Sequence, residues 1–414
     1  MSDTINIVLF DGVYHQKLKP LTFTRPVADL RVGIFKIRKK WEHALSTKIN
    51  FRCKTYLAKK YQSVSAKADI GICSALLPNN NLCEAINKLK DKTIMMKEGK
   101  VLVIKPLPKE DLDNELNDYK IVQFTSEINI IEKPMDIFRL NGLEIANDLK
   151  WILNEKTVFN NDRETNIFIG DQIYIEKGAF VKGATLNSTD GPIYIFKGAE
   201  VMEGSNLRGP LVVMENSVIK MGSKIYGPTT IGPCCKVGGE LSNVVFQGYS
   251  NKAHDGFMGN SVIGHWCNFG ADTNTSNLKN NYGIVKSWSY ETGKYESTDT
   301  LYCGLIAGDH SKSGINTMFN TGSVLGAFVN VFDAGFPPKF IKSFSWGNSK
   351  GFETYKFTKA IEVAQTVMSR RAVELDQETV NIYKAIFKNT VKFDPTKPLA
   401  PVIKTLIFLF MLSF

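Results

Sequence analysis

The chain has 414 residues, of which 43% are hydrophobic and 22% are charged, and its formal net charge is +10. This length predicts two or three domains, and the composition is typical of a globular protein and excludes a disordered or fibrous one. The positive charge favours anionic small molecules as binding partners. Nucleic acid is not expected as a partner, because the lysines are scattered and no zinc-finger or RNA-binding signature is present.

The seven cysteines form no CxxC pair, which favours reduced thiols in a cytoplasmic protein. The first ten residues lack the basic start and long apolar core of a signal peptide. An apolar stretch at 406–412 is far shorter than the ~20 residues that a membrane-spanning helix needs. We therefore expect no membrane span.

The amino-terminal part, residues 1–153, has the pattern of a mixed α/β domain. A short apolar strand is expected at 5–10, a helix at 34–45, and two strands within 93–104 around the Glu98-Gly99 turn. Helical spacing at 135–153 predicts a helix that connects this domain to the rest of the chain.

The middle of the chain carries a repeat of six residues, a period that belongs neither to a helix nor to an ordinary strand. Small residues such as Ala199, Ser205 and Ser217 recur four positions after an aliphatic residue, as the corner of a coil requires. A hexapeptide repeat indicates a parallel β-helix, in which three repeats close one triangular coil. The aliphatic positions are Ile195, Val201, Leu207, Val213, Ile219, Ile225, Ile231 and Val237.

The repeat extends on both sides of this run, so we expect the β-helix to occupy residues 165–345. The segment 187–192 shifts the phase by two residues, a polar loop at 277–300 interrupts the pattern, and Pro337-Pro338 is expected to close the stack. Helix-forming residues at 353–387 predict a capping element within a third region, 352–414. On either side of the central run, the interior position of the hexad is predicted at Ile169, Ile175, Val181, Ile263, Phe269, Thr275, Ile306, Met318 and Val324.

Hexads of this composition resemble the left-handed β-helix of the hexapeptide acyltransferases. The resemblance implies a homotrimer in which acyl-CoA lies along the groove between neighbouring coils and two subunits build each active site. The fold class expected for the whole chain is therefore an α/β domain, a left-handed parallel β-helix and a helical cap at the carboxyl end.

The segment from His254 to Gly264 reads HDGFMGNSVIG. It is similar to the H-x-x-Y-x-G-x-x-x-I-G stretch in the acetyltransferase half of the bifunctional N-acetylglucosamine-1-phosphate uridyltransferase family. The resemblance implies that His254 is the general base that takes a proton from the amine of the sugar as the amine attacks the thioester. Histidine suits this role, because its unperturbed pKa near 6.5 leaves it mostly neutral at pH 7.

The same ungapped alignment places further residues of the site. It implies that Asn268 and Asn277 contact the substrate, and that the backbone at Ala271 faces the thioester of acetyl-CoA. For Asn277 an alternative is the Asn281-Tyr282-Gly283 segment, which resembles the family's N-Y-D-G equally well.

Three positions depart from the family's pattern. Lys224 replaces an arginine that holds the sugar phosphate, Ser242 replaces a lysine, and Phe257 replaces the tyrosine. Either Lys252 or Lys236 supplies the missing charge for substrate binding, or the acceptor is not the usual amino-sugar phosphate.

Two further pairs of polar residues follow the main motif. Arg370-Arg371 lies on the expected cap and is a candidate for binding the phosphates of CoA through charge-assisted hydrogen bonds. Asp309-His310 opens a loop beside the late coils, so His310 is a candidate for a second polar group in the site.

The segment from Leu18 to Pro26 resembles the L-x-P-L-T-x-x-x-P stretch of sugar-nucleotide pyrophosphorylases, and Glu132-Lys133-Pro134 is similar to their V-E-K-P. The glycine-rich phosphate loop of those enzymes is missing, because only Gly12 stands between residue 10 and residue 18. Together the two halves resemble a bacterial family of sugar nucleotidyltransferase and acetyltransferase fusions with a shortened first domain. The resulting candidates for a nucleotide or sugar-phosphate site are Arg25, Asp29, Arg31 and Lys133.

Three functions compete. The first is a CoA-dependent N-acetyltransferase acting on an amino-sugar 1-phosphate such as glucosamine-1-phosphate, with nucleotidyl transfer from a nucleoside triphosphate as a second activity. That second activity would need Mg²⁺, whose ligands no carboxylate pair identifies. The second is a zinc enzyme built on His254, His265 and His310, although the HxxxxH spacing of such β-helix enzymes is missing. The third is a non-catalytic trimeric scaffold that carries a nucleotide-sugar-binding domain.

Overall fold

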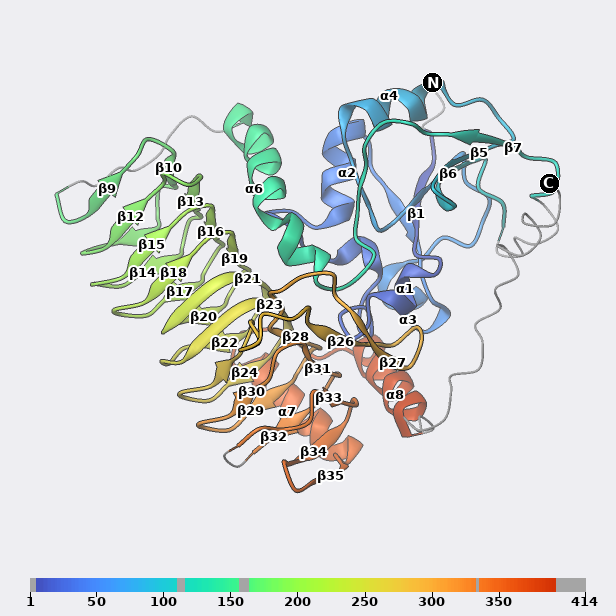
Figure 1. The fold of residues 1–414 in the computed structure, drawn as a ribbon. Helices are drawn as coiled ribbons and strands as arrows, with labels where there is room; N and C mark the ends of the chain where they lie inside the picture. Colours follow the sequence, from blue (N-terminus) through green and yellow to red (C-terminus); the bar gives the residue numbers. More distant parts are fainter. Residues whose placement is uncertain (1–4, 110–115, 156–163, 333–334, 392–414) are drawn as a thin grey trace.

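The computed structural model describes residues 5–109, 116–155, 164–332 and 335–391 (Figure 1). An α/β unit comes first, built on a six-stranded sheet in the order β2-β1-β3-β6-β5-β7. Strand β1 pairs in parallel with β2 and β3, whereas β6 is antiparallel to both of its neighbours. The strands are β1 (Ile7–Phe10), β2 (Asn50–Arg52), β3 (Ile70–Cys73), β5 (Thr93–Lys97), β6 (Lys100–Lys105) and β7 (Lys120–Gln123).

Short helices and a small second sheet surround these strands. The helices are α1 (Tyr14–Lys17), the 3-10 helix η1 (Val27–Asp29), α2 (Ile37–Leu45), α3 (Thr55–Tyr61) and α4 (Asn80–Lys88). Strands β4 (Leu76–Leu77) and β8 (Asn129–Ile130) form an antiparallel pair. The expected strand at the start of the chain, the helix near residue 40 and the two strands around Glu98-Gly99 are all present.

The connecting helix α6 (Asp136–Glu155) leads from this unit to the second part of the chain. Its apolar side packs on the outside of the first coils, where Ile145 and Leu149 share a buried cluster with Tyr194 and Val212. The helix therefore joins the two parts by packing as well as by the chain.

The second part is the predicted parallel β-helix with three faces. Equivalent residues of successive coils pair in parallel and lie 18 residues apart along the chain, as in Ile193, Leu211 and Thr229. This spacing corresponds to three hexapeptides per coil, the repeat of the left-handed β-helix. The fold class expected from the sequence is confirmed.

Each face is a ladder of short strands. Face A contains β9 (Ile167–Ile169), β12 (Thr185–Asn187), β15 (Asn206–Arg208), β18 (Lys224–Tyr226), the first halves of β21 (Glu240–Gly248) and β23 (Phe257–His265), β25 (Asn274–Thr275) and β30 (Met318–Phe319). Face B contains β10 (Ile173–Ile175), β13 (Ile193–Ile195), β16 (Leu211–Val213), β19 (Thr229–Ile231), the second halves of β21 and β23, β28 (Leu305–Ala307), β31 (Ser323–Leu325) and β33 (Phe340–Ile341). Face C contains β11 (Phe180–Val181), β14 (Glu200–Val201), β17 (Val218–Ile219), β20 (Lys236–Val237), β22 (Asn251–Lys252), β24 (Asn268–Phe269), β29 (Lys312–Ser313), β32 (Asn330–Val331), β34 (Ser345–Asn348) and β35 (Gly351–Thr354).

The interior of the β-helix is formed by the hexad residues. All eight aliphatic positions from Ile195 to Val237 are buried in one core cluster. Small residues fill the corners, where the hydroxyl of Ser217 donates to the carbonyl of Gly232 at 2.7 Å. The phase shift is also confirmed, because Ile175 pairs with Ile195, 20 residues further along the chain instead of 18.

Outside this run, four predicted core positions are wrong by one residue. Ile169 and Met318 are exposed, and the neighbouring Phe168 and Phe319 pack in the interior instead. After the polar loop, Ala307 and Leu325 point inward, while Ile306 and Val324 face outward.

The outward residues at 306 and 324 are apolar for a different reason. They join Val245 and Val262 in an outer strip on face B, which lies in the same buried cluster as the α/β unit. A strand that is buried on both faces shows no alternation of apolar and polar residues, so its sequence does not indicate which side faces the interior of the coil.

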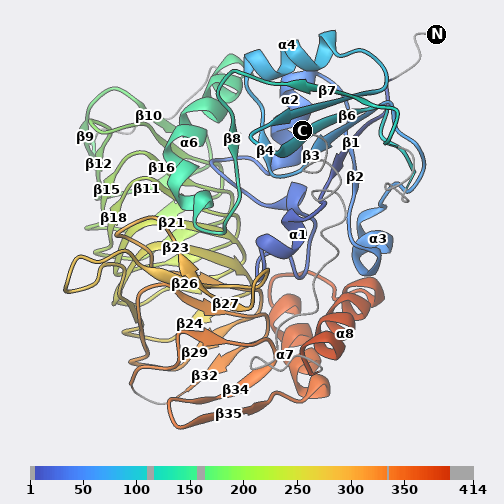
Figure 2. The same cartoon turned by 45° about the vertical axis from the view of Figure 1, so that its right-hand side comes forward.

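The stack does not end at Pro337-Pro338. Strand β33 pairs with β31, β34 pairs with β32, and β35 then folds back antiparallel onto β34. Two helices follow, α7 (Phe357–Ser369) and α8 (Gln377–Val391), and Figure 2 shows both beside the last coils. This is the predicted helical cap, whereas the apolar stretch at 406–412 lies outside the described residues.

One corner between faces B and C carries a column of stacked rings. His310 stacks on Phe328 with ring centroids 4.5 Å apart, and Phe328 stacks on Phe344 at 4.7 Å. Tyr383 of α8 contacts this column, and its hydroxyl lies 2.9 Å from Nε2 of His310. The cap is thus held by aromatic packing along the corner, and His310 is a buried member of the column.

A buried ion pair fastens the α/β unit to the coils. The guanidinium of Arg25 donates to the carboxylate of Asp309, which also accepts a hydrogen bond from Thr24 Oγ1 at 2.7 Å. The other oxygen of Asp309 accepts from the backbone N–H of His265 at 2.8 Å. Both charged side chains are nearly inaccessible to solvent.

The substitution Asp309→Asn should therefore destabilise the protein strongly. Removing one partner of a buried ion pair leaves the other charge uncompensated, which costs about 3–5 kcal/mol. Urea denaturation followed by circular dichroism measures this loss. Glu362→Gln, which removes the exposed partner of Lys359, is the matched control and should cost at most about 1 kcal/mol. Equally small losses of stability in the two variants would show that the ion pair does not stabilise the contact between the α/β unit and the β-helix.

Candidate functional site

The corner that carries His254 lies between faces C and A, after β22 and before β23. His254 is exposed to solvent. The next coil turns at the same corner, where the backbone N–H of Asp272 donates to the carbonyl of Asp255 at 3.0 Å. Ala271 therefore occupies the position equivalent to His254 on the neighbouring coil. Gly239 belongs to the preceding coil, where an added Cβ would lie 3.0 Å from the carbonyl oxygen of His254.

Lys252 is placed inside the coil, next to this corner. Its backbone pairs with Val237, whose side chain fills the interior, and Lys252 itself is buried. Its ammonium donates to the carbonyls of His254 and Asp255 at 2.7 and 3.1 Å, and burial lowers its pKa to about 8. Lys252 therefore holds the corner from within and does not offer its charge at the surface.

The other predicted substrate residues, Lys224 and Asn277, lie on the side of face A. Lys224 is exposed, and its Nζ is 3.9 Å from Oε2 of Glu240, which pairs with Phe257 on the next coil. Asn277 donates through Nδ2 to Oδ1 of Asn260 at 2.7 Å. The structure thus brings His254 and Ala271 together and places Lys224 and Asn277 beyond that corner.

Asn268, Arg370 and Arg371 meet in a separate cleft between face C and the end of α7. The cleft has a volume of about 530 Å³. Four of its described lining residues are basic and none is acidic. They are Lys236, Tyr249, Asn251, Trp266, Cys267, Asn268, Lys312, Val367, Arg370 and Arg371.

The floor of the cleft is a ladder of polar side chains from four successive coils. Lys236, Asn251, Asn268 and Lys312 pair in register, and each begins its strand. Adjacent strands are about 4.8 Å apart, so the two lysines stand roughly 14 Å from each other along the axis. The ladder has a cationic group at each end and two neutral amides between them.

Hydrogen bonds order the amides in the middle of this ladder. Asn251 donates to Oδ1 of Asn268 at 3.3 Å and accepts from the guanidinium of Arg371 at 3.1 Å. Our reading of the sequence missed Asn251 and Lys312 as parts of a site. Their positions at the first residue of strands in consecutive coils are the signal that was available.

Two stacked rings border the cleft at the corner between faces B and C, of which Trp266 is buried and Tyr249 is half-buried. Tyr249 and Trp266 stack with ring centroids 4.3 Å apart and planes at 26°. Both line the cleft. Basic groups beside an aromatic face suit a ligand that combines phosphates with a planar ring system.

The joint between the two parts of the chain contains three of the four residues predicted to bind a nucleotide. Arg25 is engaged by Asp309, and Asp29 forms an ion pair of 2.8 Å with Lys36. The backbone of Arg31 exchanges two hydrogen bonds with the side-chain amide of Gln247, at 2.8 and 3.0 Å. Within the part of the chain that the structure describes, Nη1 of Arg25 and Nε of Arg31 have no hydrogen-bond partner.

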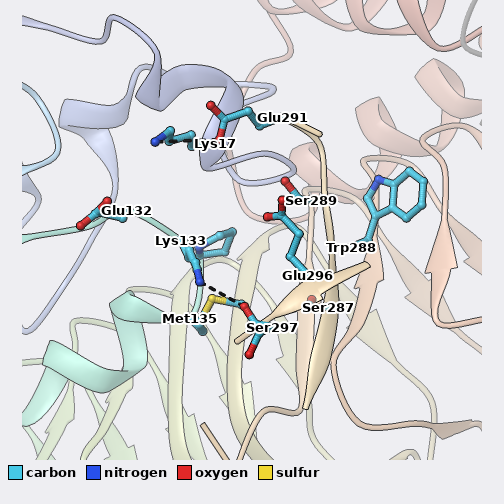
Figure 3. A pocket seen from close by; sticks show the side chains of 11 residues that line it. Lys17, Glu132, Lys133, Met135, Ser287, Trp288, Ser289, Glu291, Glu296 and Ser297 are labelled. Carbon is cyan, nitrogen blue, oxygen red and sulfur yellow. Dashed lines mark hydrogen bonds and ion pairs between the residues drawn. The ribbon is translucent and has the colours of Figure 1, made fainter. Parts of the chain in front are cut away.

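Lys133, the fourth of these residues, lies at a smaller cavity of about 90 Å³ (Figure 3). This cavity lies between the α/β unit and a hairpin formed by β26 (Lys286–Ser289) and β27 (Lys294–Ser297). The ammonium of Lys133 forms an ion pair of 2.8 Å with Asp299 and donates to the carbonyl of Ser297 at 3.0 Å. The structure therefore separates Lys133 from Arg25, Asp29 and Arg31.

The described residues contain no group of three or more His, Cys, Asp or Glu side chains that could hold a metal ion. Mg²⁺ commonly uses only one or two protein carboxylates together with substrate phosphates, but no such carboxylates can be assigned here. Nor does any described helix have the length and apolar character needed to cross a bilayer.

Comparison with known proteins gives one match to a family model. Residues 7–157 match the family described as sugar nucleotidyl transferase. No curated protein matches the chain.

Two of the similar solved structures are an acyltransferase and a hexapeptide transferase family protein. An Arabidopsis UDP-N-acetylglucosamine acyltransferase is 13% identical over 51% of this chain and 79% of its own, with a TM-score of 0.24. A hexapeptide transferase family protein from Anaplasma phagocytophilum is 13% identical over 56% of this chain and 98% of its own, with a TM-score of 0.14. At these TM-scores neither structure bears on the function of this chain.

We predict that anion binding in the cleft would depend on pH through Lys312. Its Nζ donates to the carbonyl of His310 at 3.0 Å, and burial lowers its pKa to about 8. An anionic ligand needs the protonated amine, so affinity should be greatest below pH 8 and fall as the pH rises through that value. Isothermal titration calorimetry with adenosine 3′,5′-bisphosphate, whose phosphates are already ionised at pH 7, measures this dependence.

Lys312→Met should weaken this binding by roughly tenfold and flatten its pH dependence, because a hydrogen bond to a charged group contributes about 1.5–3 kcal/mol. Lys177→Met, at an exposed position on an early coil, is the matched control and should change neither property. An affinity that is constant between pH 7 and pH 9 would contradict the assignment of Lys312.

Proposed function

We propose that the protein is a CoA-dependent acyltransferase that acetylates the amine of an amino-sugar 1-phosphate of the glucosamine-1-phosphate type. The observation that carries this proposal is the cleft on face C, which has four basic lining residues, no acidic one among those described, and an aromatic border. Arg370 and Arg371 would hold the phosphates of acetyl-CoA, with Lys236 and Lys312 on the opposite wall.

The path from the cleft to His254 supports the same assignment. Asn251 lines the cleft, and His254 follows it three residues later at the far edge of the same face. An extended chain covers about 10 Å in three residues, a span that the flexible arm of CoA can bridge. The phosphates would then bind in the cleft while the thioester reaches the exposed imidazole.

In the proposed reaction, His254 acts as general base. Its neutral imidazole accepts a proton from the sugar amine as the nitrogen attacks the thioester carbonyl. The C–N bond forms, the C–S bond breaks, and the departing CoA sulfur takes a proton. The backbone N–H of Ala271 would stabilise the oxyanion of the tetrahedral intermediate.

We propose that the active form is the homotrimer that the resemblance to the hexapeptide acyltransferases implies. The exposure of His254 in a single chain supports a covering subunit, because its reaction requires exclusion of water. A neighbouring subunit packed against this corner would cover the imidazole. Lys224 and Asn277 on face A would then contact the acceptor from one of the two subunits.

We also propose that the α/β unit binds a sugar phosphate through Lys133 and transfers a nucleotidyl group. The match of residues 7–157 to a sugar nucleotidyl transferase family supports this second activity. We derive no step through Mg²⁺, because no ligand set for it can be assigned. Arg25, Asp29 and Arg31 would contribute to nucleotide binding only if the joint opened, since their side chains are engaged or buried there.

A second candidate is a non-catalytic trimeric scaffold that carries a nucleotide-sugar-binding domain. It is favoured by Ser242 and Phe257, which replace a lysine and a tyrosine of the acyltransferase pattern, and by the missing glycine-rich loop. Release of CoA from acetyl-CoA in the presence of an acceptor separates the two candidates.

His254→Ala should lower kcat for CoA release by roughly 10²–10⁴-fold, the usual contribution of a general base. The assay follows the free thiol with acetyl-CoA and glucosamine-1-phosphate. His43→Gln is the matched control, because His43 stacks on Trp151 of α6, outside the corner and the cleft, and should leave the rate unchanged. Full activity in the His254 variant would overturn the mechanism, and a wild-type protein that releases no CoA would favour the scaffold.

Sedimentation velocity tests the proposed assembly. Wild-type protein should sediment as a trimer of the 46.3 kDa chain. Its activity per chain should fall when the protein is diluted below the dissociation constant of the trimer, because residues from two subunits would form each active site. A fully active monomer would contradict this part of the proposal.

A further inference from the structure

The small cavity beside Lys133 is formed by residues from both parts of the chain. The α/β unit contributes Lys17, Glu132 and Lys133, and the β26–β27 hairpin contributes Ser287, Ser289 and Glu296 (Figure 3). The hairpin is an insertion between coils of the β-helix, so it does not belong to the region that matches the nucleotidyl transferase family.

The two faces of the hairpin have different environments. Trp288 and Tyr295 are cross-strand neighbours, and Trp288 stacks on Phe340 of the coil at 4.2 Å. Ser287 and Glu296 are the adjacent cross-strand pair, so their side chains leave the opposite face of the ribbon. Figure 3 shows Ser289 and Glu296 directed toward the side where Lys133 lies.

Two polar groups on this face lack partners within the described structure. Ser287 is only 5% exposed, and its Oγ has no hydrogen-bond partner. Glu296 is half-buried and forms no ion pair or hydrogen bond with any described residue. A buried hydroxyl without a partner is costly, and such groups usually bind a ligand or ordered water.

The opposite wall of the cavity carries two lysines, Lys17 and Lys133, beside Glu132, whose carboxylate is paired with Lys100 at 2.6 Å. The ammonium of Lys133 lies within 2.8 Å of Asp299, and that of Lys17 is 3.9 Å from the carboxylate of Glu291. Both ion pairs reach solvent, since the side chains of Lys17 and Lys133 are 27% and 39% exposed. Such pairs are weak, and a phosphate can replace the carboxylate. The cavity therefore offers hydrogen-bond acceptors on the hairpin and cations on the α/β unit.

We infer that this cavity binds an amino-sugar phosphate with its amine free, and that Glu296 makes it selective for the ammonium over the N-acetyl form. The carboxylate of Glu296 accepts from the ammonium, Ser287 bonds a sugar hydroxyl, and Lys17 and Lys133 hold the phosphate. The choice of an amino sugar rests on the proposed function.

The size of the cavity agrees with this ligand. Its volume of about 90 Å³ accommodates the amine and part of one sugar ring, since a single water needs roughly 10–15 Å³ by the same measure. An acetyl group on the nitrogen would remove the positive charge and add bulk next to Glu296. Both effects disfavour the acetylated sugar.

Binding to the full-length protein without acyl donor tests the inference. Isothermal titration calorimetry compares glucosamine-1-phosphate with N-acetylglucosamine-1-phosphate on wild type, Glu296→Gln and Ser287→Ala. We expect wild type to bind the free amine at least tenfold more tightly. Glu296→Gln should weaken that binding by roughly 10- to 100-fold, as for the loss of a charge-assisted hydrogen bond, and should leave the acetylated sugar unaffected.

The control variant is Glu203→Gln, which removes an exposed carboxylate on a distant coil and should change neither affinity. Unchanged melting temperatures show that the variants are folded. Equal affinity for the two sugars, no binding of either, or equal weakening of both by Glu296→Gln would overturn the inference. Selective binding without CoA release would instead overturn only the proposed acyl transfer, and CoA release without this selectivity would overturn only the inference.

Discussion

The constraint on which this structure depends is the closure of each coil on the one before it. Each short strand pairs with its equivalent on the next coil, 18 residues away in the regular part of the repeat. The backbone hydrogen bonds are therefore satisfied only if the aliphatic positions stay in phase inside the coil. The same constraint aligns the outward residues. Side chains that are 15 to 18 residues apart, or 44 across the polar loop, become neighbours about 4.8 Å apart.

Each functional feature of the β-helix follows from this alignment. The polar floor of the cleft, from Lys236 to Lys312, is one such column on face C. The stacked rings of His310, Phe328 and Phe344 are another, at a corner, where they anchor the cap that carries Arg370 and Arg371. A candidate binding surface is thereby built from residues that no local motif connects.

The contact between the α/β unit and the β-helix determines which faces of the β-helix remain accessible. The α/β unit covers face B through an apolar strip and the buried pair of Arg25 and Asp309, while α7 borders face C. The corner of His254 is left open, and the hairpin after β25 reaches the α/β unit beside Lys133. The cleft on face C lies beside α7, and the small cavity lies between the α/β unit and the hairpin, so each forms where two separate elements meet.

The sequence by itself determined the repeat, its phase over the eight hexads, the two-residue shift and the presence of a cap, because these depend on the local period of side chains. The sequence also predicted roles for Asn268, Arg370 and Arg371 one by one, but it did not predict that the three line one cleft. Only the tertiary structure decided that Lys252 points inward, that Ile306 and Val324 face the α/β unit, and that Arg25 pairs with Asp309. These features depend on contacts between segments far apart in the chain. Such contacts leave no periodic pattern in the sequence, because the packing of whole helices and strands decides which partner buries each residue.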